Sequence, residues 1–380
     1  MKKTTANRKH GSLIPNTARA QDAIITGLSV RRFKGFDHLE IEQISRVTLL
    51  GGRNNVGKTS VLEALMMFHD SLNPQMILRQ FAMRGVGIIP FEPQSMWAPV
   101  FFDYNLEQQV EIAIVINDEK EILKFSYNPD FEAPTITARD APPGFIATQI
   151  RTDQKPVPSY SLDITYESKS NSYVSHLLMG LGYLELRTEK TRFHLRPVTF
   201  ITARTPVNPA EDARRFGQLD IIGKQNSIVN FLTIIEPRLK SLSSVTIGDT
   251  SLIHGDIGLS RKIPVSYMGD GMARLLSIIL AIATTQNGVV LIDECENGLH
   301  HSIMPKIWHA IGQAAREYNC QVICTTHSYE CVAAAEEGMA GDLTKDFCYV
   351  RIDRDDKTFT ARRFDHEMLA IALKNNMEVR

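Results

Sequence analysis

Apolar and polar positions follow two different patterns in the strands that the chain predicts. Residues 46–50 (RVTLL), 289–292 (VVLI) and 321–324 (QVIC) are almost continuously apolar, which is typical of strands buried on both faces of a parallel sheet. Residues 28–33 (LSVRRF) and 38–44 (HLEIEQI) alternate instead, as strands with one exposed face do. Together the patterns predict an α/β fold with a central, mainly parallel sheet and an antiparallel β subdomain near the N-terminus.

Helical patterns occupy several segments between these strands. Residues 60–69 are expected to form a helix, residues 275–283 form a very apolar one, and an apolar face recurs from Met304 to Ala315. Residues 216–242 also have helical spacing. No heptad repeat is sustained, so we expect a short β/α insert and no long coiled coil.

Turn-forming residues mark the expected loops and hairpins. Asn117 and Asp118 separate two strand-like runs and predict a hairpin. A loop is expected over residues 74–93, and a long proline-rich excursion over residues 133–161. The tail from residue 347 predicts a strand, a turn, a second strand and a helix.

A glycine-rich loop follows the first apolar strand and precedes a helix. Residues 52–59 (GRNNVGKT) match the pattern G-x-x-x-x-G-K-[ST] in the strand, loop and helix context of a phosphate-binding loop. Its glycines let backbone N–H groups surround phosphates, and the following helix N-terminus favours negative charge. Lys58 would reach the β and γ phosphates of a nucleotide, and Thr59 would bind Mg²⁺. The predicted nucleotide-binding residues are Gly52, Asn54, Asn55, Val56, Gly57, Lys58, Thr59 and Ser60.

Two carboxylates, Asp293 and Glu294, directly follow the apolar run at 289–292. Charges at that point lie at the carboxyl edge of a parallel sheet, where α/β proteins bind their ligands. We expect Asp293 to bind the same Mg²⁺ ion as Thr59, and Glu294 to act as the general base for an attacking water. Taken alone, the pair is also compatible with a solvated strand end.

Two further elements extend this set. His327 follows the run at 321–324 and can hydrogen-bond a γ phosphate or its attacking water, although an isolated histidine more often has a structural role. Gly269, Asp270 and Gly271 form a turn before the apolar helix, whose N-terminus is a second potential anion site. Such a turn by itself more commonly just caps a buried helix.

In this order the motifs resemble those of the ABC-type ATPase head shared by the RecF, SMC, Rad50 and OLD proteins. GRNNVGKTS resembles the Walker A motif, MGDGM the signature, VVLIDE the Walker B motif, ENGLH the D-loop and TTHS the switch-histidine motif. The set is most similar to the OLD-like AAA15 ATPases of bacteria and archaea, many of which belong to anti-phage defence systems. The resemblance implies a P-loop NTPase fold that binds ATP and Mg²⁺.

The resemblance also implies that two heads pair head to tail around ATP. Gly269, Asp270 and Gly271 would then act in trans on the γ phosphate bound by the partner's Walker A loop. Gly269 stands where the usual signature has a serine, so backbone N–H groups would have to replace that hydroxyl. The Q-loop glutamine is not assigned, and Gln80 and Gln94 are both candidates.

On this basis the chain divides into four segments. Residues 1–22 are expected to form a disordered basic arm, and residues 23–100 the N-terminal lobe of the head with its Walker A loop. Residues 101–260 are expected to be a β-rich and then helical insert, and residues 261–380 the C-terminal lobe with the other motifs. We expect no TOPRIM nuclease domain of the kind that OLD nucleases carry.

Composition limits the possible partners and the compartment. The 380 residues carry a formal net charge of −1, so no general polyanion-binding surface is implied, and nucleic acid would have to bind at local basic patches. Five cysteines without paired spacing favour a reducing compartment, and no zinc-binding pattern is present. No apolar run approaches the roughly 20 residues that cross a bilayer. We therefore expect a cytoplasmic protein without a membrane partner.

These observations favour a Mg²⁺-dependent ATPase that pairs with itself as a dimer or higher homo-oligomer. The resemblance suggests the sensor or regulatory ATPase of an anti-phage defence system, controlling a separate toxin or nuclease. A RecF-like DNA-repair ATPase is one alternative, distinguished by DNA-stimulated hydrolysis and a steep salt dependence. A non-hydrolysing scaffold held together by ATP is another, distinguished by an assay of phosphate release.

Overall fold

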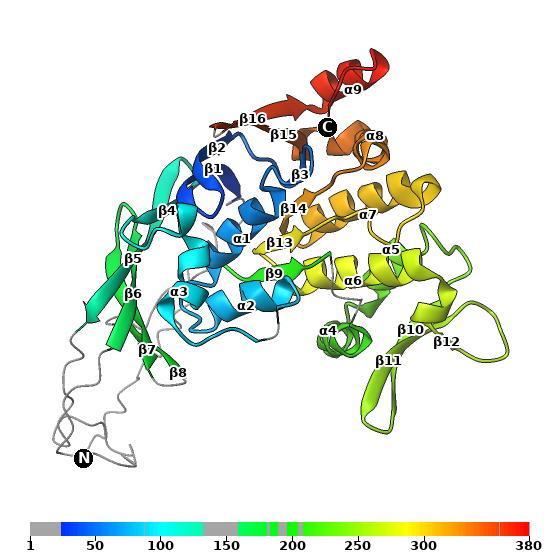
Figure 1. The fold of residues 1–380 in the computed structure, drawn as a ribbon. Helices are drawn as coiled ribbons and strands as arrows, with labels where there is room; N and C mark the ends of the chain where they lie inside the picture. The colour runs from blue at the N-terminus through cyan, green and yellow to red at the C-terminus, as the bar shows by residue number, and fades with distance from the viewer. Residues whose placement is uncertain are drawn as a thin grey trace, which may run out of the picture.

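The fold is that of a computed structural model, which describes residues 24–86, 88–131, 159–180, 183–188, 196–203, 208–356 and 358–379. The basic arm predicted at residues 1–22 and most of the proline-rich excursion predicted at 133–161 lie outside the described residues. The element labels below follow Figure 1.

A six-stranded sheet forms the centre of the molecule, in the order β16-β15-β3-β14-β13-β9 (Figure 1). Every neighbouring pair is parallel except β15 and β16, which are antiparallel at one edge. The mainly parallel central sheet is thus confirmed. Its strands are β3 (Val47–Gly51), β9 (Val198–Ile201), β13 (Val289–Ile292), β14 (Gln321–Thr325), β15 (Phe347–Asp355) and β16 (Thr358–Asp365).

The continuous apolar run of β13 is explained by burial on both faces. Val290 and Ile292 belong to the hydrophobic cluster on the side of α6 (Asp270–Thr284) and α7 (Met304–Glu317). Val289 and Leu291 point the other way, into the cluster that contains α1 (Lys58–His69). Because successive side chains of a strand alternate between faces, a strand with a core on each side needs apolar residues at every position.

A seven-stranded antiparallel sheet packs beside the centre, in the order β2-β1-β4-β5-β6-β7-β8. The expected hairpin is confirmed, because Asn117 and Asp118 join β4 to β5 with φ values of 51° and 61°, as a tight hairpin turn requires. The strands are β1 (Ile25–Phe33), β2 (Phe36–Glu42), β4 (Val110–Ile116), β5 (Glu119–Phe131), β6 (Ser159–Glu167), β7 (Ser172–Gly180) and β8 (Tyr183–Thr188).

Helix α1 lies between the two sheets, in contact with β9, β13 and β14 on one side and β4 on the other. The loop expected over residues 74–93 is wrong in part, since it contains α2 (Met76–Met83) and the beginning of the short α3 (Pro93–Met96). Helix α2 buries Met76, Ile77 and Gln80 on one face, a spacing that fits a helix but is too short to stand out in the sequence.

Four further helices and a small sheet complete the other side of the molecule. The single helical segment expected at 216–242 is wrong, because Gly223 at φ 71° separates α4 (Pro209–Ile221) from α5 (Gln225–Leu232), and β10 (Ser241–Ile247) follows. Strands β10, β11 (Thr250–Asp256) and β12 (Ile263–Pro264) form a three-stranded sheet. The remaining helices are α8 (Tyr329–Gly338) and α9 (His366–Lys374), and short 3₁₀ turns occur at Ala98–Val100, Phe102–Tyr104, Val265–Met268, His301–Ile303 and Gly341–Asp346.

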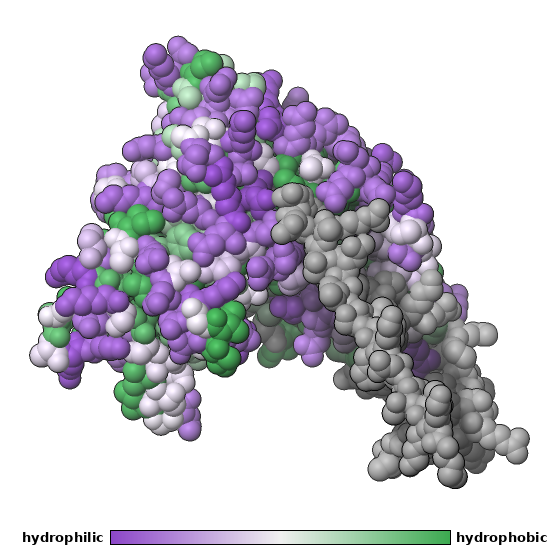
Figure 2. Space-filling view, turned by 180° about the vertical axis from the view of Figure 1, so that it is seen from behind, coloured by the Kyte–Doolittle hydropathy of each residue, from purple (hydrophilic) through white to green (hydrophobic). Residues whose placement is uncertain are grey.

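The outer surface is largely hydrophilic on the face seen in Figure 2. Apolar atoms show at the tip of the β10–β11 hairpin and over the end of α4, where Ile247, Ile221 and Ile222 are exposed. In the described part of the chain the longest helix, α6, has 15 residues, so the expected absence of a long coiled coil is confirmed there. None of the helices described combines the length and apolar character needed to cross a membrane.

Candidate functional site

A cavity of about 980 Å³ opens at the carboxyl edge of the central sheet. The loop between β3 and α1 and the ends of β9, β13 and β14 contribute to its walls. Nine of the predicted site residues line it: Asn54, Asn55, Gly57, Lys58, Thr59, Ser60, Asp293, Glu294 and His327. The fold therefore brings together the phosphate loop, the two carboxylates and the histidine, which lie up to 273 positions apart in the sequence (Asn54 to His327).

The phosphate loop depends on two glycines in backbone conformations that other residues rarely adopt. Gly52 has φ 131° and Gly57 has φ 88°. A Cβ atom at Gly52 would collide with the backbone carbonyl of Ile352, and one at Gly57 would collide with the ring of Phe36. Val56 between them is buried in the core and anchors the loop.

Lys58 begins helix α1 and folds back over the loop that precedes it. Its Nζ donates hydrogen bonds to the backbone carbonyls of Gly52 at 2.7 Å and Arg53 at 2.9 Å. Burial lowers the pKa of Lys58, while the nearby negative charges of Glu296 and Asp293 counteract that shift. The first turn of α1 contains no acidic residue, so the helix N-terminus and the ammonium group together favour an anion.

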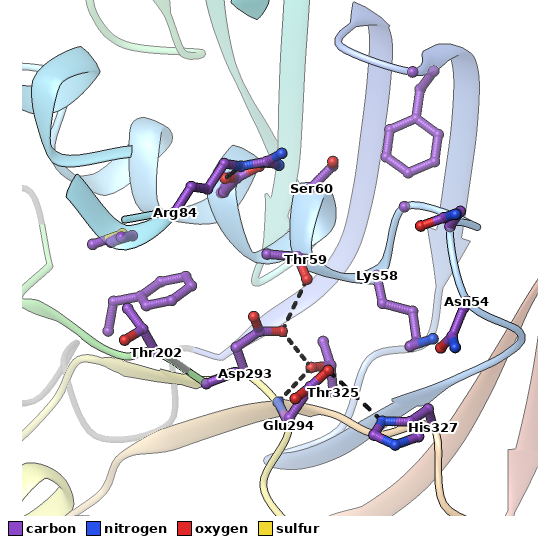
Figure 3. Close-up of a pocket in the computed structure, with 18 of the residues that line it drawn as sticks. Asn54, Lys58, Thr59, Ser60, Arg84, Thr202, Asp293, Glu294, Thr325 and His327 are labelled. Atoms are coloured by element: carbon purple, nitrogen blue, oxygen red, sulfur yellow. Dashed lines mark hydrogen bonds and ion pairs between the residues drawn. The ribbon is translucent and has the colours of Figure 1, made fainter. Parts of the chain in front are cut away.

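Asp293 is the meeting point of two hydroxyl groups from different elements (Figure 3). Its Oδ1 accepts hydrogen bonds from Thr59 Oγ1 at 3.0 Å and from Thr325 Oγ1 at 2.6 Å. Burial raises the pKa of Asp293, and these two bonds oppose the rise. A hard cation beside Thr59 and Asp293 would offset the same burial, so these oxygen ligands fit Mg²⁺. When bound there, Mg²⁺ would neutralise charge on phosphate oxygens.

The side chain of Glu294 lines the cavity, and its backbone is strained. Its φ is 47°, in the left-handed region that non-glycine residues seldom occupy, and such strain concentrates at functional sites. Its N–H donates to Thr325 Oγ1 at 2.9 Å, and Asn297 Nδ2 donates to its Oε2 at 3.0 Å. The side chain is 41% exposed, so a water molecule can reach the carboxylate.

His327 lies just beyond the end of β14, next to Glu294. Its Nδ1 is 3.7 Å from Oε1 of Glu294 and 3.3 Å from Oε1 of Glu296 (Figure 3 draws the former). Lys58 approaches the same region from the opposite wall of the cavity (Figure 3). The cluster of Lys58, His327 and the two carboxylates that line the cavity, Asp293 and Glu294, is suited to bind a phosphate group and activate a water beside it.

The turn of Gly269, Asp270 and Gly271 is not among the residues that line the cavity. Gly269, with φ 113°, precedes α6, and no other group lies within 4 Å of the position a Cβ would take there. Tyr267 beside it is 81% exposed. The trans role of this turn stays a prediction.

An ion-pair cluster on one wall of the cavity was not anticipated from the sequence. Glu63 accepts two hydrogen bonds from Arg84, each of 2.7 Å, and one of 2.6 Å from Lys34. Burial tends to raise the pKa of Glu63, but the attraction of Lys34 and Arg84 outweighs it and lowers the pKa. Burial also lowers the pKa of Lys34 to about 8. Arg84 lines the cavity as an additional cation, in a segment whose pattern had indicated only a loop.

An aromatic pair forms another unanticipated part of the cavity wall. Phe36 and Phe359 meet edge to face with ring centroids 4.8 Å apart, and the guanidinium carbon of Arg354 lies 5.4 Å from the Phe359 ring centroid. All three residues line the cavity. Phe36 is fully buried and supports the half-buried Phe359, whose ring can stack a nucleobase beside the exposed Arg354. The sequence did not indicate this aromatic group, because its residues are far apart along the chain and β2 and β16 become neighbours only in the fold.

Neither candidate for the Q-loop glutamine lines this cavity. The strand beside β13 is β9, and Ile201 pairs with Ile292, so the next residue, Thr202, reaches the cavity beside Asp293. Gln80 is buried on α2 and lines a separate neighbouring cavity, and Gln94 is exposed. Thr202 therefore lines the cavity beside Asp293, and the Q-loop glutamine stays unassigned.

Residues 47–333 match the family described as "AAA domain, putative AbiEii toxin, Type IV TA system". The chain belongs to this family. The matched segment begins with β3 and ends within α8, so it includes every part of the cluster around Lys58, Asp293 and His327. Membership in this AbiEii-type AAA family, with the phosphate loop in place, makes the chain an ATPase-type P-loop protein.

Individual relatives extend the same likeness. A Helicobacter pylori protein named "ATP/GTP phosphatase" is 22% identical over 382 residues, covering 93% of this chain and 98% of its own length. An uncharacterized protein of Methanocaldococcus jannaschii is 30% identical over 104 residues, covering 26% of this chain and 88% of its own. Among solved structures, one titled "Crystal structure of the SmcHead bound to the C-winged helix domain of ScpA" has a TM-score of 0.50 at 12% identity, covering 90% of this chain and 98% of that one. That likeness concerns the fold.

Proposed function

We propose that the protein is a Mg²⁺-dependent ATPase that switches by ATP-driven, head-to-tail pairing. The observation that carries the proposal is the convergence of Lys58, Asp293 and Glu294 in one cavity, with His327 beside them. The relative named "ATP/GTP phosphatase", which this chain matches over nearly its whole length, supports a nucleotide-hydrolysing activity.

Each residue of the cluster has a distinct part in this proposal. The N–H groups of the phosphate loop and Lys58 bind the β and γ phosphates, and Thr59 and Asp293 hold Mg²⁺. Glu294 accepts the proton of the attacking water, and the imidazole of His327 orients the water or the γ phosphate. Phe359, supported by the buried Phe36, stacks the nucleobase.

The pairing part of the proposal rests on the location of the signature turn. Gly269, Asp270 and Gly271 lie outside the cavity of their own chain, and Tyr267 beside them is exposed. A second copy in head-to-tail orientation would bring that turn onto the γ phosphate. ATP would then stabilise the closed pair, and hydrolysis would open it.

The biological part of the proposal is a regulatory ATPase in an anti-phage defence system of the OLD-like AAA15 type. The family description, which names a toxin of a type IV toxin–antitoxin system, supports a defence context. We propose that the chain acts in the cytoplasm and controls a separate toxin or nuclease. A gene for such an effector beside the gene for this chain would support the proposal, and replication genes would favour DNA repair instead.

The variant Glu294→Gln tests the catalytic proposal. Losing the general base should lower kcat by about 10²-fold to 10⁴-fold and leave ATP binding intact. Size-exclusion chromatography with ATP and Mg²⁺ should show the variant accumulating as a closed oligomer. Wild-type turnover in Glu294→Gln would refute the assignment.

Two further outcomes separate the alternatives. No phosphate release by the wild-type protein, together with ATP-dependent assembly, would indicate a scaffold. Hydrolysis stimulated by DNA, with binding that falls steeply as salt rises, would indicate a RecF-like repair ATPase. The present proposal expects hydrolysis that free DNA does not stimulate.

A further inference from the structure

Glu296 is a nearly buried carboxylate that the cluster described above does not use. It follows Asp293 by three positions, in the turn after β13, and its side chain is 10% exposed. Its Oε1 accepts a hydrogen bond of 2.7 Å from Thr326 Oγ1 and one of 3.0 Å from the backbone N–H of His327. Two donors from the adjoining strand end therefore fix this oxygen before any ligand arrives.

The same oxygen lies against the imidazole of His327. Nδ1 of the ring is 3.3 Å from Oε1 of Glu296 and 3.7 Å from Oε1 of Glu294. Both neighbours are carboxylate oxygens, which act only as acceptors when ionised. A ring nitrogen that faces two such oxygens is attracted to them when it carries hydrogen and repelled when it presents its lone pair, so this arrangement favours hydrogen on Nδ1.

Packing alone does not hold this ring in place. The His327 side chain is 46% exposed, and in the described part of the chain its ring makes polar contacts with the two carboxylates. Glu294 is itself 41% exposed, whereas Glu296 is almost buried and tied down by two other hydrogen bonds. Glu296 is consequently the more rigid of the two acceptors.

We infer that Glu296 is a positioning residue, which holds His327 with Nδ1–H toward its carboxylate and leaves Nε2 for contacts in the cavity. The inference rests on the proposed function of that cavity as an ATP hydrolysis site. It also separates the two carboxylates: Glu296 engages the imidazole, and Glu294 stays available to the attacking water. Without Glu296, only the exposed Glu294 would remain beside Nδ1, at 3.7 Å, and the ring would lose the rigid acceptor that favours hydrogen on Nδ1.

The state of the ring can be measured directly in the full-length protein with ¹⁵N-labelled histidine. The His327 signals are identified by their loss in His327→Gln. In the wild type the neutral ring should show a protonated Nδ1 and an unprotonated Nε2. Glu296→Leu, which removes the acceptor, should shift the ring toward the form with hydrogen on Nε2. Glu296→Gln, which retains an oxygen at the same reach, should keep most of the wild-type form.

Steady-state kinetics supply the second readout. Glu296→Leu should lower kcat about tenfold or more with KM changed by less than about threefold, since an oriented acid–base group acts in the chemical step. The kcat of the double variant Glu296→Leu/His327→Gln should be no more than about threefold below that of the less active single variant, because both changes remove one shared interaction. Glu337→Leu, an exposed carboxylate on α8, is the matched control and should behave as wild type.

These measurements have outcomes that separate the inference from the function on which it rests. A wild-type His327 with hydrogen on Nε2, or a ring state unchanged in Glu296→Leu, would overturn the positioning role. Fully multiplicative losses in the double variant would do the same. A wild-type protein that hydrolyses no nucleotide would instead refute the proposed function, and the histidine spectra would still report whether Glu296 orients the ring.

Discussion

Helices α1 and α6 both begin at a glycine turn, but only one of these turns faces a finished site. Gly57, at φ 88°, precedes α1, whose first turn contains no acidic residue and borders the cavity. Gly269, at φ 113°, precedes α6, whose first turn contains Asp270 and lies outside the cavity. A helix N-terminus attracts anions, and a carboxylate within its first turn already uses part of that attraction. The α1 end therefore keeps its full attraction for a phosphate.

In the segments that the structure describes, the buried charged groups beside α1 form ion pairs, whereas those beside α6 do not. Glu63 on α1 is paired with both Lys34 and Arg84, and its pKa is lowered. Asp212 on α4 forms no such ion pair within the described residues. It accepts a hydrogen bond from Ser277 of α6, and burial raises its pKa to about 6. Arg274 of α6 is buried with Nε and Nη2 lacking hydrogen-bond partners among the described residues. The buried carboxylate on α1 is therefore neutralised by cations, whereas the buried Asp212 and Arg274 beside α6 lack ion pairs in the described part of the chain.

Removing the carboxylate of Glu63 should produce the largest change. Glu63→Gln removes the buried carboxylate that pairs with the largely buried Lys34 and with the half-exposed Arg84, so the free energy of unfolding should fall by about 3 kcal/mol. Urea denaturation followed by circular dichroism measures it. Glu337→Gln on exposed α8 should stay within about 0.5 kcal/mol of wild type. A similar small loss for both variants would contradict the pairing described for Glu63.

Removing the ammonium group of Lys58 should separate the two glycine turns by function. Lys58→Ala should weaken ATP binding by about 10-fold to 100-fold, as expected for loss of a charge-assisted hydrogen bond to phosphate. Isothermal titration calorimetry gives the affinity, and Lys374→Ala, an exposed lysine on α9, serves as the control. Gly269→Ala should instead retain binding and lose hydrolysis. Unchanged binding in Lys58→Ala would argue against the phosphate loop.

The pH dependence of the free energy of unfolding should report the raised pKa of Asp212, which is buried beside α6. The folded-state pKa of Asp212, about 6, exceeds its ordinary value of 3.8, so the proton binds the folded state more tightly. This contribution is complete below about pH 4 and is lost as pH rises through about 6. Asp212→Asn should therefore equal wild type at pH 4 and be more stable at pH 7, by roughly 2–3 kcal/mol at most. A gap between the two proteins that stays constant across this range would contradict the raised pKa.

The prediction of the fold succeeded where one pattern filled a whole element. Apolar β13 and β14, the hairpin at Asn117 and Asp118, and the strand–turn–strand–helix tail were all indicated by periodicity and turn chemistry. The break at Gly223 was missed because both helices keep apolar residues at helical spacing across it. Helix α2 was missed because it is only 8 residues long and lies among turn-forming residues.

The residues of the candidate site likewise fall into those that a local pattern predicted and those that it did not. Lys58, Asp293 and Glu294 could be named because each sits in a local motif whose chemistry depends on adjacent residues. Arg84 and Arg354 could not, since nothing near either of them in the sequence indicates a ligand. Arg84 follows the end of α2 and Arg354 lies on β15, and both reach the cavity because these elements pack against others far away along the chain.

By itself the sequence determined the chemistry that the chain carries and the order of its parts: a phosphate loop before a helix, carboxylates after a buried strand, and a histidine after the next. Local patterns specify such features because backbone conformation and side-chain alternation depend on neighbouring residues. Only the tertiary structure decided which groups share the cavity, gave Glu63 its two cations, and set Glu296 against His327. The contacts of Glu63 and Glu296 join positions 21 to 31 residues apart, so they arise only when strands and helices pack.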